Sequence, residues 1–123
     1  DNERILFVDD ERLQTDMVEE FGHALGYQVT TCRNSKTALT LFGKDKNAFD
    51  LVVTDMVMPD MPGSLLAQKL IEIRPDLPII LCSGYSDDID KTVFDHIGIA
   101  HYMTKPFSMA EFAKSIHKVL KKG

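Results

Sequence analysis

Several kinds of segment are missing from this sequence, and each absence argues against a class of function. No apolar stretch approaches the roughly 18–20 residues of a membrane helix, so we expect no part of the chain to span or contact a bilayer directly. The first residues, Asp1-Asn2-Glu3-Arg4, are not those of a signal peptide. The net charge is −5 and no long basic run occurs, so direct binding to nucleic acid is not expected.

Cysteine is scarce, and neither cysteine nor histidine shows the spacing of metal ligands. Cys32 and Cys82 both fall in predicted strands. We interpret them as small buried hydrophobic residues in a reducing compartment, and therefore expect a cytoplasmic chain. The histidines are interpreted as surface or half-buried side chains: His23, His96, His101 and His117.

Repeats, linkers and low-complexity segments are also absent. A length of 123 residues fits one domain with one core, so we expect a single domain over residues 1–123. The chain does not begin with Met, from which we expect that it was cut from something longer or was processed.

Short apolar runs alternate with helical patterns along the whole chain. Strands are predicted at 5–8, 28–32, 51–54, 79–82 and 100–103. Apolar residues at helical spacing follow the strands and are expected to mark helices. The series are Leu13, Met17, Phe21 and Leu25; Ala38, Leu39 and Phe42; Leu66, Leu70 and Ile73, which are expected to face inward; and Ile89, Val93 and Ile97. For the last helix, Ser108 and Glu111 form a capping box, with Phe107 and Phe112 as its hydrophobic staple.

Five strand–helix pairs predict an α/β fold with a doubly wound parallel sheet. The first, third and fourth strands are nearly continuous apolar runs, as expected for strands buried on both faces. The second and fifth include polar residues, such as Gln28 and His101, which places them at the edges. The strand order 2-1-3-4-5 satisfies this with right-handed crossovers, and it is the flavodoxin-like variant.

Acidic residues stand at the predicted switch point of this sheet, where ligands bind in such folds. The first strand ends in Asp9-Asp10-Glu11 and the third in Asp55. Carboxylates brought together need a cation, and oxygen ligands with water suit Mg²⁺. A helix cap is the simpler explanation of an acid at a loop start, and for Glu11 the two interpretations are equally open.

Two further strand ends carry groups that phosphoryl transfer requires. Ser83 ends the fourth strand, and its hydroxyl can hydrogen-bond a phosphoryl oxygen. Lys105 follows the fifth strand and can pair with a phosphate as a point charge. With Mg²⁺, these groups would neutralise and orient a phosphoryl group while Asp55 attacks it in line. Either residue taken alone would carry little information.

The motifs Asp9-Asp10-Glu11, Thr54-Asp55-Met56-Val57-Met58-Pro59, Ser83-Gly84 and Thr104-Lys105-Pro106-Phe107 resemble those of response-regulator receiver domains. The resemblance implies phosphorylation of Asp55 by a histidine kinase or a histidine phosphotransfer domain. It also implies Mg²⁺ held by Asp10, Asp55 and the carbonyl of Met56, with Asp9 acting through a bound water. A cis Lys105-Pro106 bond is expected. Apart from catalysing its own phosphorylation and dephosphorylation, an isolated receiver is not an enzyme.

The same resemblance implies how the signal leaves the site and how long it lasts. Tyr102 matches the aromatic switch position that follows the movement of Ser83, which directs a downstream partner to the face of the fourth helix, fifth strand and fifth helix. Val57 and Tyr85 flank the approach of the hydrolytic water. Neither side chain can orient that water, so slow self-dephosphorylation is expected.

The origin of the chain remains open between three possibilities. The segments 4–11 and 81–86 resemble receivers at the C-terminus of hybrid sensor histidine kinases, whose parent chain would tether the domain to the inner membrane. A free-standing regulator and a regulator trimmed of its effector are the alternatives.

Two unrelated functions use a similar scaffold. A flavodoxin-like electron carrier needs a Ser/Thr/Gly-rich phosphate loop after the first strand, where three acids stand instead. A haloacid-dehalogenase-like phosphatase needs a second Asp two residues after its nucleophile, and Val57 occupies that position.

Overall fold

The computed structural model describes residues 2–84 and 91–120, with the side chain of Lys91 left out. Strands and helices alternate throughout. Their bounds are β1 Arg4–Val8, α1 Arg12–Leu25, β2 Gln28–Cys32, α2 Ser35–Lys44, β3 Leu51–Asp55, α3 Gly63–Ile73, β4 Ile79–Ser83, α4 Lys91–Ile97, β5 His101–Thr104 and α5 Met109–Leu120.

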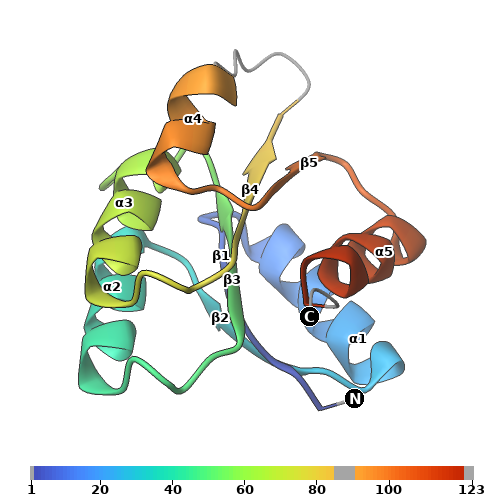
Figure 1. The fold of residues 1–123 in the computed structure, drawn as a ribbon. Coiled ribbons are helices and arrows are strands. Elements are labelled where there is room, and N and C mark those ends of the chain that lie inside the picture. The colour runs from blue at the N-terminus through green and yellow to red at the C-terminus, as the bar shows by residue number, and fades with distance from the viewer. Residues whose placement is uncertain (1, 85–90, 121–123) are drawn as a thin grey trace.

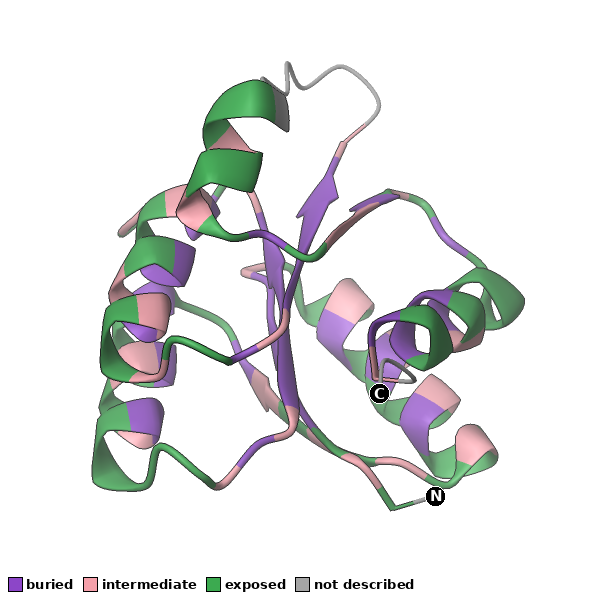
Figure 2. Cartoon of the chain, in the orientation of Figure 1, coloured by how far each residue is buried: buried purple, intermediate pink, exposed green. Residues whose placement is uncertain are grey.

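The five strands form one parallel sheet in the order β2-β1-β3-β4-β5, which confirms the predicted fold class. Helices α1 and α5 cover one face, and α2, α3 and α4 cover the other (Figure 1). Strands β3 and β4 are buried throughout, whereas β2 and β5 each have one buried residue and are otherwise half-buried or exposed (Figure 2). The edge assignment made from polar content is therefore confirmed.

Each face of the sheet has its own apolar core. On the α1/α5 face, Phe7 and Val53 pack with Val18, Phe112 and neighbouring residues. On the other face, strand residues such as Leu81 pack with side chains of α2 and α3. Successive side chains along a strand point to opposite faces of the sheet. Because both faces are buried, the residues of a central strand that point to either face are mainly apolar, which explains the continuous apolar runs.

The ends of the helices follow the signals in the sequence. Ser108 and Glu111 make the predicted capping box, with bonds of 2.8 and 3.1 Å between each side chain and the other residue's N–H. The staple residues Phe107 and Phe112 stack with ring centroids 6.0 Å apart. Gly98, with φ 111°, follows α4 in a conformation that L side chains rarely adopt.

Two apolar residues of the helical series are exposed: the inward position expected for Ile73 was wrong, whereas Leu13 lies in α1 as predicted. Leu13 is 83% exposed, although Phe21 and Leu25 of the same series pack against the core. A series with spacing four drifts about 40° round the helix at each step, so Leu13 points away from the side that Leu25 faces. Ile73, the last residue of α3, is 37% exposed at the margin of the buried stripe.

Candidate functional site: an acidic cleft at the strand ends

The register of the sheet brings the acidic motifs side by side. Val8 of β1 pairs with Thr54 of β3, so Asp9 and Asp55 follow at the same level. Asp55 in turn lies opposite Cys82 of β4, one residue before Ser83. Parallel strands end at the same edge of a sheet, which explains how motifs far apart in sequence meet in one cleft.

Three carboxylates converge in this cleft. Ligand oxygens of Asp9, Asp10 and Asp55 all lie within 4.8 Å of one another. Asp9 is fully buried and Asp55 is 5% exposed, while Asp10 is half-buried. An oxygen-only donor set of this size fits a hard divalent cation such as Mg²⁺ and offers nothing to a metal that prefers sulfur or nitrogen.

Lys105 reaches the cluster from the end of β5. Its Nζ lies 3.1 Å from Asp9 Oδ2, 3.2 Å from Asp55 Oδ2 and 3.7 Å from Glu11 Oε1. The main-chain N–H of Lys105 donates to the carbonyl of Ser83 at 2.8 Å, and the Lys105–Pro106 bond is cis, as expected. One ammonium thus serves both buried carboxylates.

Burial and crowding shift the pKa values of this cluster. Burial raises the pKa of Asp55 to about 6, the charge of Asp9 acts in the same direction, and Lys105 opposes both. Burial also raises the pKa of Asp9, against the hydrogen bond from the Glu11 N–H and the charge of Lys105. For Lys105 burial disfavours the charge, but Asp9 and Asp55 outweigh it and hold the pKa above its ordinary value. The cleft carries an excess of negative charge that a cation would relieve.

Glu11 does not cap α1 with its side chain. It occupies the N-cap position of α1, but its carboxylate accepts no hydrogen bond from the helix. Instead, Asp9 Oδ1 accepts a hydrogen bond from the N–H of Glu11 at 2.9 Å. The Glu11 carboxylate pairs with the ammonium of Lys105 at 3.7 Å. Of the two interpretations left open for Glu11, a cap made by a side-chain hydrogen bond is therefore not supported.

The loop of residues 56–62, between β3 and α3, forms one wall of the cleft. Val57, Met58 and Pro59 line it, together with Gly84 and the charged groups. The carbonyl of Met56, expected from the resemblance to bind metal, accepts the N–H of Gly63 at 2.8 Å, and Met56 is not among the lining residues. Its neighbour Val57 faces the cleft, and the metal-binding role of the Met56 carbonyl stays a prediction.

Two residues of this region were missed by sequence reasoning. A side chain at Gly63 would collide with the carbonyl oxygen of Asp55, so only glycine lets α3 begin against the end of β3. The carboxylate of Asp60 accepts the N–H groups of Ser35 at 3.1 Å and Lys36 at 2.9 Å. Neither contact has a local sequence signal, since the partners lie on other elements.

The remaining candidate residues lie around the cleft. Ser83 is buried at the end of β4, and Val57 is 58% exposed. The hydroxyl of Tyr102, on β5, donates to Asp95 Oδ1 of α4 at 2.8 Å. Burial raises the pKa of this phenol, and the bond to Asp95 acts in the same direction. Tyr85, expected to flank the approach of the hydrolytic water, falls outside the described residues.

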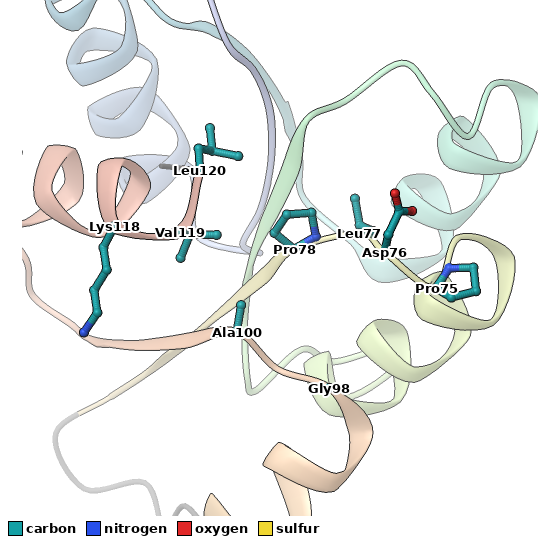
Figure 3. Close-up of a pocket in the computed structure, with 9 residues that line it drawn as sticks. All are labelled: Pro75, Asp76, Leu77, Pro78, Gly98, Ala100, Lys118, Val119 and Leu120. Atoms are coloured by element: carbon teal, nitrogen blue, oxygen red, sulfur yellow. The ribbon is translucent and has the colours of Figure 1, made fainter. Parts of the chain in front are cut away.

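A larger hollow at the opposite end of the sheet has a different character. It measures about 660 Å³, against about 340 Å³ for the cleft, and is lined by the α3–β4 turn, Gly98, Ala100 and the end of α5 (Figure 3). Its lining is mainly proline and aliphatic side chains with single charges, Asp76 and Lys118. Asp76 pairs with Arg74 at 3.2 Å. The converging carboxylates thus belong to the smaller cleft.

Comparison with known proteins agrees with this geometry. The family profile of the response regulator receiver domain matches residues 5–117. The two-component response regulator ARR10 of Arabidopsis thaliana is 36% identical over 122 residues, which make up 98% of this chain and 22% of that protein. The probable transcriptional regulator ycf27 of Porphyra purpurea is 35% identical over 121 residues, 98% of this chain and 49% of that protein. The chain therefore spans between about a fifth and a half of these relatives.

Solved structures resemble the whole of the described fold. A response regulator receiver domain protein from Clostridium thermocellum has a TM-score of 0.90 at 25% identity, covering 97% of this chain and 94% of that one. The non-phosphorylated HemR receiver domain from Leptospira biflexa has a TM-score of 0.88 at 28% identity, covering 99% and 97%. Within the described residues, no helix combines the length and the apolar character that crossing a membrane requires.

Proposed function

Because the chain belongs to the response regulator receiver domain family, we propose that it accepts a phosphoryl group on Asp55 from a histidine kinase or a histidine phosphotransfer domain. The observation that carries this proposal is the position of Asp55, at the floor of a cleft with two other carboxylates and with the ammonium of Lys105 at 3.2 Å. A two-component phosphorelay is the process that this chemistry serves.

In the transfer, a carboxylate oxygen of Asp55 attacks phosphorus in line. The bond between phosphorus and the donor's imidazole nitrogen breaks, the imidazole leaves with the bonding pair, and an acyl phosphate forms on Asp55. Lys105 would pair with the phosphoryl oxygens, and the hydroxyl of Ser83 would donate a hydrogen bond to one of them. Both groups act by position and charge.

Asp10 and Asp55 would hold Mg²⁺ directly, with Asp9 acting through a water. The third protein ligand would be a main-chain carbonyl of the β3–α3 loop; Val57 is the better candidate, since the Met56 carbonyl already accepts a bond from Gly63. When bound, Mg²⁺ would supply the positive charge that lets a phosphoryl group approach this acidic cleft.

Labelling by a small phosphodonor tests the proposal. Acetyl phosphate with Mg²⁺ should add one phosphoryl group, seen by intact mass, and EDTA should prevent it. Asp55→Asn should abolish labelling, whereas Asp50→Asn, at the other end of the same strand, should label like the parent. Equal labelling of Asp55→Asn and the parent would refute Asp55 as the acceptor.

Phosphorylation would be read out through Ser83 and Tyr102. The phosphoryl group, with a charge of about −1.5 to −2 and three acceptor oxygens, would draw the Ser83 hydroxyl toward it and vacate space for the Tyr102 ring. The bond from Tyr102 to Asp95 would then break, altering the α4–β5–α5 face for a downstream partner. Beryllofluoride with Mg²⁺ should shift amide signals of residues 97–103, and Ser83→Ala should weaken these shifts. Shifts confined to the cleft would identify a phosphate relay instead of a switch.

The lifetime of the acyl phosphate would depend on Val57 and Tyr85, the two residues expected to flank the approach of the hydrolytic water. An exposed aliphatic side chain beside the cleft cannot orient a hydrolytic water, so dephosphorylation would be slow. Val57→Asn should hydrolyse faster, as measured by the decay of the phosphorylated mass.

The whole protein would be a cytoplasmic regulator or a hybrid kinase carrying this receiver, and the native sequence on either side would decide between them.

A further inference from the structure

The wall of the cleft formed by Val57, Met58 and Pro59 depends on contacts made outside the cleft. Its loop begins at Met56, whose N–H donates to the Cys82 carbonyl at 2.7 Å and whose carbonyl accepts the Gly63 N–H at 2.8 Å. These bonds fix the two ends of the loop, at β3 and at α3. The three lining residues lie between those ends and need an attachment of their own.

Asp60 supplies that attachment by bonding to a different helix. Its two carboxylate oxygens accept separate N–H groups of the first turn of α2, from Ser35 and Lys36. In the same contact the hydroxyl of Ser35, which is fully buried, donates to the carbonyl of Met61 at 2.8 Å. Three hydrogen bonds therefore join the middle of the loop to α2.

Helix α2 does not need Asp60 as its only cap. Asn34, at the N-cap position, already accepts the N–H of Thr37 at 2.7 Å. Partial desolvation raises the pKa of Asp60, but the bonds from Lys36 and Ser35 outweigh it and leave the pKa below its ordinary value. The carboxylate thus remains charged and bonded across the pH range in which the cleft would bind Mg²⁺.

We propose that Asp60 is a positioning residue for the metal site. It would hold the β3–α3 loop so that the loop carbonyl proposed as a Mg²⁺ ligand, that of Val57, stays in place for binding the metal with Asp10 and Asp55. The proposal rests on the proposed function only for the identity of the metal. Without the Asp60 bonds, the loop would sample positions in which that ligand is displaced. Mg²⁺ would then bind more weakly, while the phosphoryl transfer in the loaded protein would change little.

Titration of the unphosphorylated protein with MgCl₂, followed by amide signals, tests this directly. Asp60→Ala should raise the Mg²⁺ dissociation constant about three- to tenfold, within the range expected for losing such helix-capping bonds. Asp60→Asn keeps one of the two acceptor oxygens and should fall between Asp60→Ala and the parent. In acetyl phosphate labelling, the Mg²⁺ concentration for half-maximal rate should rise with Asp60→Ala, and the saturating rate should stay within about twofold.

Asp50→Ala is the matched control. Asp50 also accepts a main-chain N–H, from Arg4 at 2.8 Å, and its pKa is also lowered, but it lies at the end of β3 away from the cleft. It should lower stability without changing Mg²⁺ binding. Unchanged binding in Asp60→Ala, or equal weakening in both variants, would overturn the proposal.

A second variant covers the case in which Asp60→Ala fails to fold. Ser35→Ala removes the bond to Met61 with little change of volume, and it should weaken Mg²⁺ binding in the same direction; unchanged binding there would also overturn the proposal. If the parent itself is not labelled on Asp55, the proposed function fails, whereas the MgCl₂ titration still decides the role of Asp60.

Discussion

Asp50 immediately precedes β3 and Asp55 is the last residue of that strand, and their surroundings have opposite effects on their charges. Asp50 receives the N–H and guanidinium of Arg4; despite partial burial, which raises its pKa, these bonds hold the pKa below the ordinary value. Asp55 is buried beside Asp9, and its pKa is raised to about 6. The fold therefore stabilises the charged form of Asp50 and disfavours the charged form of Asp55.

The surroundings of the two residues extend this contrast to the two ends of the sheet. At the Asp50 end, Arg74 also donates to the carbonyl of Phe49 at 2.6 Å and pairs with Asp76. At the cleft end, three carboxylates cluster, and the ammonium of Lys105 is shared by two of them, Asp9 and Asp55, and by Glu11. Charge left without full compensation is characteristic of sites that bind a ligand of opposite charge, and it lowers stability until that ligand binds.

Removing the cation of the cleft should have the largest effect. We expect Lys105→Ala to lower the free energy of unfolding by about 2–4 kcal/mol in EDTA at about pH 8, since two buried carboxylates lose their partner. A carboxyl group whose pKa is raised by folding lowers the free energy of unfolding of the protein as pH rises. The stability lost in Lys105→Ala should therefore shrink toward about pH 4, where these groups are protonated. Urea titrations at both pH values measure it, with exposed Lys114→Ala as the control; a Lys105→Ala deficit no larger than the control's would contradict the charge imbalance.

Removing the acceptor charge should act in the opposite direction. Asp55→Asn should raise the free energy of unfolding by about 1–3 kcal/mol without Mg²⁺, because the folded state disfavours ionised Asp55. The gain should be full above about pH 6, where Asp55 is ionised in both states, and should vanish as pH falls through the unfolded pKa of 3.8. Urea titration of parent and variant at about pH 8 and about pH 4 measures this. Lower stability of Asp55→Asn at both pH values would refute it.

The equivalent change at the other end should be destabilising. Asp50→Asn is expected to cost about 0.5–1.5 kcal/mol, because it weakens bonds at an exposed site. A lowered folded-state pKa contributes stability above the unfolded pKa of 3.8 and loses it as pH falls through the folded value. Thermal unfolding at neutral and acidic pH would detect this. A stabilising effect at neutral pH would remove the contrast between the two ends.

The smallest effect concerns the coupling between the two residues. The length of β3 separates them by about 16 Å, so their charges should act independently. The double variant Asp50→Asn/Asp55→Asn should match the sum of the single changes within about 0.5 kcal/mol by urea denaturation. A larger deviation would show that the two ends of the strand communicate through the sheet.

Much of the fold was predictable because its signals are local. Strand order followed from the polar content of residues such as Gln28 and His101, and the start of α5 from a capping box four residues long. The inward position expected for Ile73 failed because this residue ends α3 at the margin of the buried stripe. The partner of the Met56 carbonyl, the N–H of Gly63, had no local signal, because the direction of a carbonyl depends on the folded loop.

The order of the elements, the edge strands and the acids, serine and lysine at the strand ends could be derived from the sequence, since periodicity and end motifs depend on near neighbours in the chain. The contact of Lys105 with Asp9, 96 residues away, and the attachment of Asp60 to α2, 25 residues away, emerge only in the folded protein. The same is true of the difference in pKa between Asp50 and Asp55. Burial and electrostatic partners set those properties, and both come from residues that only the folded chain brings together.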